Sequence, residues 1–136
     1  MDLQKCLFET EAQVVVKARP SAAFEGLLRQ LCEVNGLPLK LERFLGGRWF
    51  RDLGDDSGHL WGFVQVIKPP TLLEIHGPLF MSYPVAGHVQ FRLAEADGGT
   101  RVTVRHRAFG LIDDTHREGA PKGWKQILDG IEGKSS

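Results

Sequence analysis

Residues 87–108, GHVQFRLAEADGGTRVTVRHRA, constrain the fold more than any other segment, because they predict two alternating strands joined by a tight turn. Asp97-Gly98 is a favoured pair for a two-residue hairpin turn. If Ala96 and Gly99 flank this turn, the register pairs Val89 with His106, Phe91 with Val104, and Leu93 with Val102 on one face. The opposite face carries His88, Gln90, Arg92, Arg101, Arg105 and Arg107. The hairpin therefore predicts an antiparallel sheet with one buried face, and it places His106 on that face.

Two apolar stripes of helical period lie outside this hairpin. The first follows Pro20, which suits the first turn of a helix, and is expected to stop at Asn35-Gly36. Its members recur at i, i+3, i+4 and i+7: Phe24, Leu27, Leu28 and Leu31. The second is near the C-terminus, where Thr115 and Glu118 have the spacing of a capping box and Pro121 is expected to open a helix. Its stripe consists of Trp124, Ile127, Leu128 and Ile131.

The remaining segments predict strands. Residues 7–19 contain a β-branched run, residues 39–41 and 48–53 alternate on either side of Gly46-Gly47, and residues 54–58 (GDDSG) are expected to form a loop. The predicted order is one strand, a helix, about six antiparallel strands and a final helix, which is an α+β arrangement.

Residues 58–77, GHLWGFVQVIKPPTLLEIHG, predict a second hairpin around Pro69-Pro70. If Lys68 lies opposite Thr71, the better inner face consists of Leu60, Gly62, Val64, Val66, Leu73, Ile75 and Gly77. Its two glycines are expected to leave volume for a pocket. The outer face would then show Trp61 and Phe63, which suggests a contact between subunits. A single bulge would exchange these two faces.

Composition limits the classes of function. A chain of 136 residues is expected to form one domain, 1–136. The 17 basic and 17 acidic residues give no net charge, so we expect neither nucleic acid nor an anionic membrane as a partner. No apolar run approaches the roughly 20 residues that cross a bilayer. Cys6 and Cys32 are expected to be buried, reduced thiols of a cytoplasmic protein.

Four segments in the same order resemble a known family: GGRWF (46–50), GHLWGFVQVIKPPTLLEIHG (58–77), GTRVTVRHRAFG (99–110) and GWKQIL (123–128). They are similar to the activator-of-heat-shock-ATPase-homologue branch of the START-like, pollen-allergen-like (SRPBCC) superfamily. The resemblance implies a helix-grip fold, in which a curved antiparallel sheet of about seven strands wraps a C-terminal helix, with a shorter helix after the first strand. It also implies a hydrophobic cavity between the sheet and the C-terminal helix.

The chain departs from that family pattern at two places. Residues 32–45 (CEVNGLPLKLERFL) are short and lack the usual second helix with its tryptophan, and the C-terminal helix has only about 12 residues after Pro121. Both departures predict a more open pocket mouth.

The candidate ligand-binding residues are those expected to line the cavity: Trp49, Arg51, Ile75, Gly77, Met81, Tyr83, Phe91, Val104, His106, Trp124 and Leu128. His106 either meets a ligand or is a core histidine. If Trp49 points inward, Arg51 enters the cavity as an anchor for a carboxylate or phenolate; if Phe50 points inward, Arg51 is solvated. The apolar segment 78–85 (PLFMSYPV) either forms a lid or packs over the end of the core or against a second subunit.

The leading hypothesis is a domain that holds a small hydrophobic or aromatic molecule in this cavity. One alternative is a polyketide-cyclase-like or dehydratase-like enzyme that uses His106 as acid or base, and the sequence does not decide whether the protein is an enzyme. The second alternative is a protein-interaction or co-chaperone-like module, or a homodimer through Trp61 and Phe63. No metal motif or cofactor motif is present, so we expect neither, and the arginines at 92, 101, 105 and 107 are expected to lie on a solvated convex face.

Overall fold

The structure is a computed structural model that describes residues 2–135. Its strands are β1 (Leu7–Val16), β2 (Glu33–Val34), β3 (Leu37–Pro38), β4 (Lys40–Leu41), β5 (Arg48–Gly54), β6 (Ser57–Lys68), β7 (Leu72–His76), β8 (Val85–Ala96) and β9 (Gly99–Gly110). Its α-helices are α1 (Pro20–Gln30) and α2 (Asp114–Asp129), and short 3-10 helices span Leu3–Cys6 and Glu132–Lys134.

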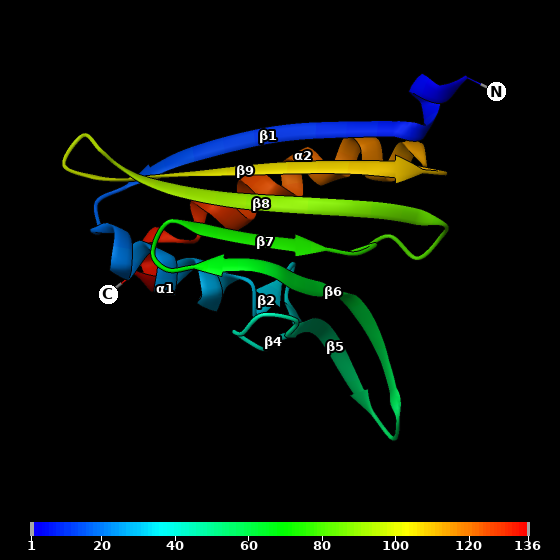
Figure 1. Cartoon of the computed structure of the whole chain (residues 1–136), viewed down its shortest axis with the longest axis horizontal. Coiled ribbons are helices and arrows are strands. Elements are labelled where there is room, and N and C mark those ends of the chain that lie inside the picture. The colour runs from blue at the N-terminus through cyan, green and yellow to red at the C-terminus, as the bar shows by residue number, and fades with distance from the viewer. Residues whose placement is uncertain (1, 136) are drawn as a thin grey trace.

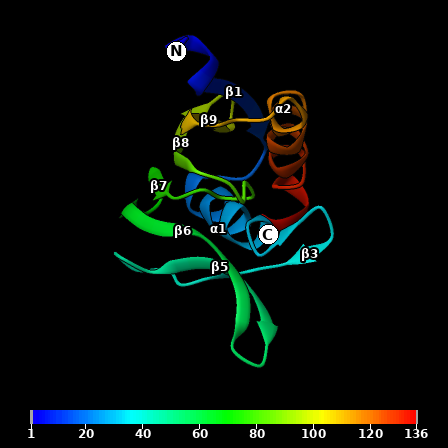
Figure 2. The ribbon, with the colours of Figure 1, turned by 90° about the vertical axis from the view of Figure 1, so that its right-hand side faces the viewer.

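Seven strands form one antiparallel sheet in the order β1-β9-β8-β7-β6-β5-β4, and β2 and β3 form a separate small hairpin. The sheet curves, with α2 lying along the face behind β8 and β9 and α1 near the ends of β6 and β7 (Figure 1). Seen from the side, the β5–β6 hairpin extends away from the rest of the sheet, and β3 lies on the same side of the molecule as α2 (Figure 2). The expected helix-grip fold, with a shorter helix after the first strand, is confirmed.

The hairpin of β8 and β9 has the predicted register. Ala96 pairs with Gly99, and the inner pairs are Val89 with His106, Phe91 with Val104, and Leu93 with Val102. All six inner side chains are buried. Of the four arginines on the opposite face, Arg92, Arg101 and Arg107 are exposed and Arg105 is half-buried. Alternation and turn chemistry suffice here because both strands are regular over their whole length.

The hairpin of β6 and β7 has the predicted pairing only in its middle, where Val64 lies opposite Ile75. The register shifts between Val64 and Val66, so Gln65 is an extra residue. Toward the turn, Ile67 pairs with Leu73 and packs against the core, whereas we expected it to point outward. The bulge explains the difference, because one extra residue reverses the facing of every residue beyond it.

A second bulge overturns the prediction for Trp61. Trp49 pairs with Gly62 and Phe50 pairs with Leu60, which leaves Trp61 as the extra residue of β6. Trp61 is therefore buried in the core at 4% exposure, and Leu60, which we expected inside, is 41% exposed. A dimer contact through Trp61 and Phe63 is wrong as predicted, because Trp61 is not on the surface and only Phe63 faces outward.

We expected the two glycines of this hairpin to leave volume for a pocket, but they do not. A Cβ atom on Gly62 would lie 2.6 Å from the carbonyl oxygen of His76, and one on Gly77 would collide with the carbonyl oxygen of Trp61. The space beside each glycine is already taken by backbone of the opposing segment. Glycine is required here because β6 and the end of β7 approach too closely for any side chain.

The helix boundaries differ from the predictions. Helix α1 ends at Gln30, and Asn35-Gly36, with φ angles of 53° and 77°, forms the turn between β2 and β3 instead of a helix stop. Helix α2 starts after Asp113, whose side chain accepts a hydrogen bond from the backbone N–H of His116 at 2.8 Å. Thr115 is therefore inside the first turn, and Pro121 is inside the helix. An aspartate two positions earlier offers the same capping chemistry as Thr115.

Helix α2 depends on its packing. An interior proline costs about 3 kcal/mol, and the two glycines at 119 and 123 cost about 1 kcal/mol each. Burying Trp124, Ile127 and Leu128 contributes roughly 1.5–3 kcal/mol per side chain. The apolar face therefore offsets the weak intrinsic helix propensity.

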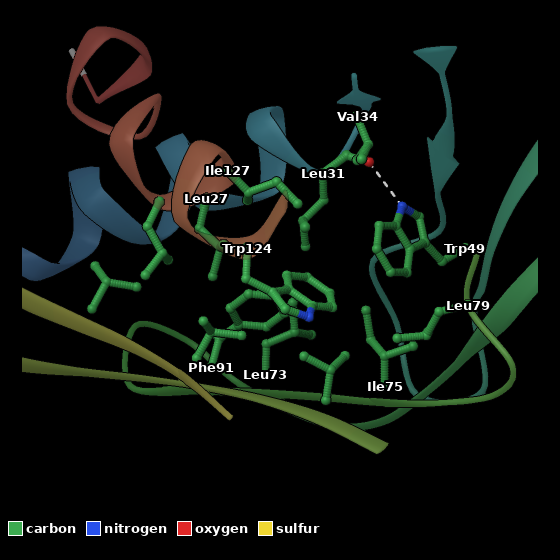
Figure 3. Close-up of a cluster of buried hydrophobic side chains, with 14 of the residues drawn as sticks. Leu27, Leu31, Val34, Trp49, Leu73, Ile75, Leu79, Phe91, Trp124 and Ile127 are labelled. Carbon is green, nitrogen blue, oxygen red and sulfur yellow. Dashed lines mark hydrogen bonds between the residues drawn. The ribbon is translucent and has the colours of Figure 1, made fainter. Parts of the chain in front are cut away.

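The core lies between the sheet and the two helices (Figure 3). Trp124 from α2 contacts Phe91 of β8 edge-on, with ring centroids 5.9 Å apart. Trp49 is fully buried and donates a hydrogen bond from its indole nitrogen to the carbonyl oxygen of Leu31 at 2.8 Å, which joins β5 to the end of α1. Trp49 therefore points inward, which was the first of the two orientations considered.

Both cysteines are free, but they are not buried as we expected: Cys6 is half-buried and Cys32 is exposed. Cys32 lies two residues beyond the end of α1. Within residues 2–135, no helix is long and apolar enough to span a membrane.

Candidate ligand-binding pocket

A pocket of about 350 Å³ opens beside α2, between this helix, the β2–β3 hairpin and the hairpin of β5 and β6. Its lining comes from five segments that are far apart in the sequence: Val34, Asn35 and Leu37; Arg51; His59 and Trp61; Phe80; and Thr115, His116, Gly119, Ala120, Gly123, Trp124 and Ile127 of α2. The pocket thus lies at the edge of the core, next to the β5–β6 hairpin. Figure 2 shows this hairpin extending away from α2 and the rest of the sheet.

Three aromatic side chains form the inner wall of the pocket. Phe80 lies in the centre of this wall, with its ring centroid 5.9 Å from that of Trp61 and 6.1 Å from that of Trp124. Aromatic pairs at such separations are in contact and hold one another in place. The wall is an apolar surface made by side chains that pack against one another.

Helix α2 contributes a flat strip to the pocket. Gly119 and Gly123 are one turn apart and both line the pocket, with Ala120 beside them. A Cβ atom added to either glycine meets no other atom within 4 Å. No packing contact therefore requires these glycines, in contrast to Gly62 and Gly77, and what they provide is space.

The rim of the pocket is polar. Arg51 and His59 face one another across β5 and β6. His116 reaches the rim from the first turn of α2, and its Nδ1 atom lies 2.8 Å from the hydroxyl oxygen of Tyr83 and 3.2 Å from a carboxylate oxygen of Asp113. These contacts engage one ring nitrogen of His116 and leave Nε2 without a protein partner among residues 2–135.

His106 lies behind the aromatic wall, inside the core. It is 1% exposed, and its Nδ1 accepts a hydrogen bond from the indole nitrogen of Trp124 at 3.0 Å. Its ring also contacts Phe8 and Phe80 edge-on. Burial in these apolar surroundings, with a smaller effect of nearby His88, lowers the pKa of His106 from 6.5 to about 4. His106 is therefore neutral at physiological pH, because desolvation disfavours its charged form.

The same contacts bear on the acid or base role considered for His106. The hydrogen-bond partner that residues 2–135 provide is an indole, which neither accepts nor supplies a proton in this pH range. The geometry corresponds to a core histidine whose Nδ1 atom accepts a hydrogen bond from Trp124.

A family model supplies the decisive comparison. The model described as "Activator of Hsp90 ATPase homolog 1-like protein" matches residues 27–133, which is most of the chain. The chain belongs to the activator of Hsp90 ATPase homolog 1-like family. No curated protein sequence matches it.

Several solved structures have a similar fold. The protein Mll3558 from Rhizobium loti has a TM-score of 0.71 and 17% identity, over 94% of this chain and 96% of that one. The Aha1 dimer from Colwellia psychrerythraea has a TM-score of 0.70 and 14% identity, over 93% and 95%. Protein CV1439 from Chromobacterium violaceum has a TM-score of 0.70 and 15% identity, over 93% and 96%. At these identities the likeness concerns the fold.

Part of the pocket lining comes from the segment in which this chain departs from the expected pattern of the family, residues 32–45. Where we expected the missing second helix to open the pocket mouth, the chain has the β2–β3 hairpin, and Val34, Asn35 and Leu37 from this hairpin line the pocket. The departure therefore contributes three residues to the lining of the pocket.

The structure separates the predicted ligand-binding residues into three groups. Arg51 and Trp124 line the pocket. Tyr83 is half-buried behind His116, and Gly77 lies against the backbone of β6. The others are buried in the core: Trp49, Ile75, Met81, Phe91, Val104, His106 and Leu128.

Several lining residues were not on the predicted list, among them His59, Trp61, Phe80 and His116. Phe80 belongs to the apolar segment 78–85, whose composition was the available signal. Trp61 lines the pocket because of a bulge in β6, and His116 because α2 starts earlier than predicted. The alternation of apolar and polar residues in the sequence indicated neither.

No cluster of three or more His, Cys, Asp or Glu side chains suited to a metal ion occurs within residues 2–135.

Proposed function

We propose that this protein binds a small apolar or aromatic molecule in the pocket beside α2. The observation that carries the proposal is the combination of an aromatic wall, made by Trp61, Phe80 and Trp124, with open space above two adjacent helical glycines. Pockets that bind small molecules are typically concave and mostly apolar, with a few polar groups at defined positions. This pocket has the same composition.

Gly119 and Gly123 support the proposal, because they leave the pocket beside α2 unfilled. Each glycine inside a helix costs about 1 kcal/mol relative to alanine. Alanine would fit at Gly119 and at Gly123 without touching another atom, so packing does not explain either residue. A ligand that lies flat on this strip explains both.

The size of the pocket limits the ligand. A volume of about 350 Å³ is near the lower end of the range for small-molecule sites. It suits a molecule of one or two rings, or a short branched chain, better than a long acyl chain. The neighbouring polar rim would orient such a molecule.

The proposal is tested with naphthylmethanol, a neutral two-ring probe, by differential scanning calorimetry and isothermal titration calorimetry. The expected result is a Tm of the wild type that rises with probe concentration, because a ligand that binds only the folded state stabilises it. Gly123→Leu would place a side chain in the pocket and is expected to abolish the rise while the free variant stays folded, because leucine is the better helix former.

Gly133→Leu is the matched control, because a Cβ atom at Gly133 also meets open space but this residue does not line the pocket. It should bind the probe like the wild type. A wild type that shows neither heat of binding nor a Tm rise would overturn the proposal. So would equal binding by Gly123→Leu.

A further inference from the structure

Arg51 is distinguished from the other arginines because it is half-buried and also has no partner within residues 2–135. Arg43, Arg48 and Arg105 form ion pairs with Glu25, Glu42 and Glu9 respectively, each at 2.8 Å. Arg51 is half-buried at the pocket rim, and no residue within 2–135 accepts a hydrogen bond from it or pairs with its charge. Arg19 and Arg107 also lack such partners, but they are exposed to water.

The acidic residues near Arg51 are engaged elsewhere or lie outside the pocket. Asp52, the next residue along β5, pairs with Lys40 at 3.2 Å. Asp56 is exposed in the turn between β5 and β6 and makes no ion pair with Arg51. Within residues 2–135, no aspartate or glutamate lines the pocket. The charged and titratable groups that do line it are Arg51, His59 and His116.

His59 adds a second group to the same part of the rim. It lies directly opposite Arg51 in the β5–β6 ladder, and both residues line the pocket. Its ring contacts Trp61 edge-on with centroids 6.2 Å apart, and neither of its nitrogens has a hydrogen-bond partner within residues 2–135. Two adjacent strands thus present two free nitrogen-bearing side chains next to the aromatic wall.

The wall itself contains an unsatisfied donor. The indole nitrogen of Trp61 is buried and has no acceptor within the described part of the chain. An indole N–H donates only, and so does a guanidinium. The groups that the protein leaves unpaired at this site therefore need an acceptor.

We infer that the pocket is selective for aromatic carboxylates, with Arg51 and His59 holding the carboxylate while the ring lies against Trp61, Phe80 and Trp124. This inference rests on the proposed binding function and adds the charge of the ligand. An arginine forms short, charge-assisted hydrogen bonds with a carboxylate. The apolar wall lowers the local dielectric and strengthens that attraction.

The test compares two probes that share the same ring system, naphthoate and naphthylmethanol, by isothermal titration calorimetry at neutral pH. The wild type is expected to bind naphthoate at least about tenfold more tightly than the alcohol, since one charge-assisted hydrogen bond contributes about that much. Arg51→Gln should bring naphthoate to the affinity of the alcohol and leave the alcohol unchanged. Arg107→Gln, which removes an exposed and unpaired arginine, is the matched control and should bind both probes like the wild type.

The outcomes separate this inference from the proposed function. If the alcohol binds the wild type, Gly123→Leu abolishes that binding, and naphthoate has no advantage, the proposed function stands and the carboxylate selectivity is wrong. If neither probe binds the wild type, both proposals fall. If Arg51→Gln weakens both probes equally, Arg51 shapes the pocket without recognising charge, which also overturns the inference.

Discussion

The indole nitrogen of Trp124 donates a hydrogen bond to Nδ1 of His106 across the interface between α2 and β9, at 3.0 Å. Both side chains are 1% exposed. The bond joins the C-terminal helix to the sheet in the middle of the core, and it satisfies two polar atoms that would otherwise be buried without partners. A buried polar atom without a partner typically costs about 1–3 kcal/mol.

This arrangement makes the stability of the protein depend on pH through His106. Its pKa is about 4 in the folded protein, against the ordinary histidine value of 6.5. Between these two values the unfolded chain binds a proton that the folded chain does not, so acid favours unfolding. The contribution is complete above pH about 6.5 and is lost as the pH falls toward about 4, by about 3 kcal/mol in all.

Urea unfolding of the wild type and of His106→Gln measures this contribution. Glutamine keeps an acceptor near Trp124 but does not titrate. We expect the variant to be less stable than the wild type at neutral pH, and the difference to shrink as the pH falls toward about 4. Curves that run parallel over this range would show that His106 does not titrate differently in the two states.

Trp49→Phe is expected to destabilise the protein by at least about 2 kcal/mol. The change removes the hydrogen bond to the carbonyl oxygen of Leu31 at 2.8 Å and replaces a fully buried indole by a smaller ring. Chemical denaturation at neutral pH gives the difference in the free energy of unfolding. Phe44→Leu, at a position that is 58% exposed, is the control and should change it by no more than about 0.5 kcal/mol.

Gly62→Ala and Gly119→Ala should have opposite effects. At Gly62 the new methyl group would meet the His76 carbonyl oxygen at 2.6 Å, so we expect a loss of about 1–3 kcal/mol or more. At Gly119 the methyl group meets open space within α2, so we expect a gain of about 1 kcal/mol. Thermal unfolding measures both. A stabilised Gly62→Ala would contradict the close approach of β6 to the end of β7.

Trp61→Glu and Phe63→Glu test the bulge in β6. A carboxylate at the buried position 61 is expected to cost more than about 3 kcal/mol or to prevent folding, because it leaves a charge in the core. At position 63, which is 38% exposed, the loss should stay below about 1 kcal/mol. Circular dichroism during urea unfolding distinguishes the two. If Phe63→Glu were the more damaging change, the facing of this strand would be the reverse of the one described.

The differences between prediction and structure occur at a few identifiable residues. The β8–β9 register followed from alternation and from Asp97-Gly98, because nothing interrupts either strand. In β6, Trp61 and Gln65 are extra residues, and a bulge leaves no mark in the pattern of apolar and polar residues. Each therefore reversed the predicted facing of its neighbours. The two helix ends were misplaced because Asn-Gly and Asp both serve in more than one kind of turn or cap.

The sequence by itself determined the order of the two helices and the long strands, the inward position of His106 and the apolar stripe of α2, because these depend on local periodicity and turn chemistry. Only the tertiary structure decided where the empty space lies. The pocket is not at the middle of the sheet, because Trp124 and His106 fill the core there. It lies beside Gly119 and Gly123, where α2 meets the strand that carries Arg51. The volume left between packed elements depends on how these elements bend and cross, so no single segment of the sequence encodes it.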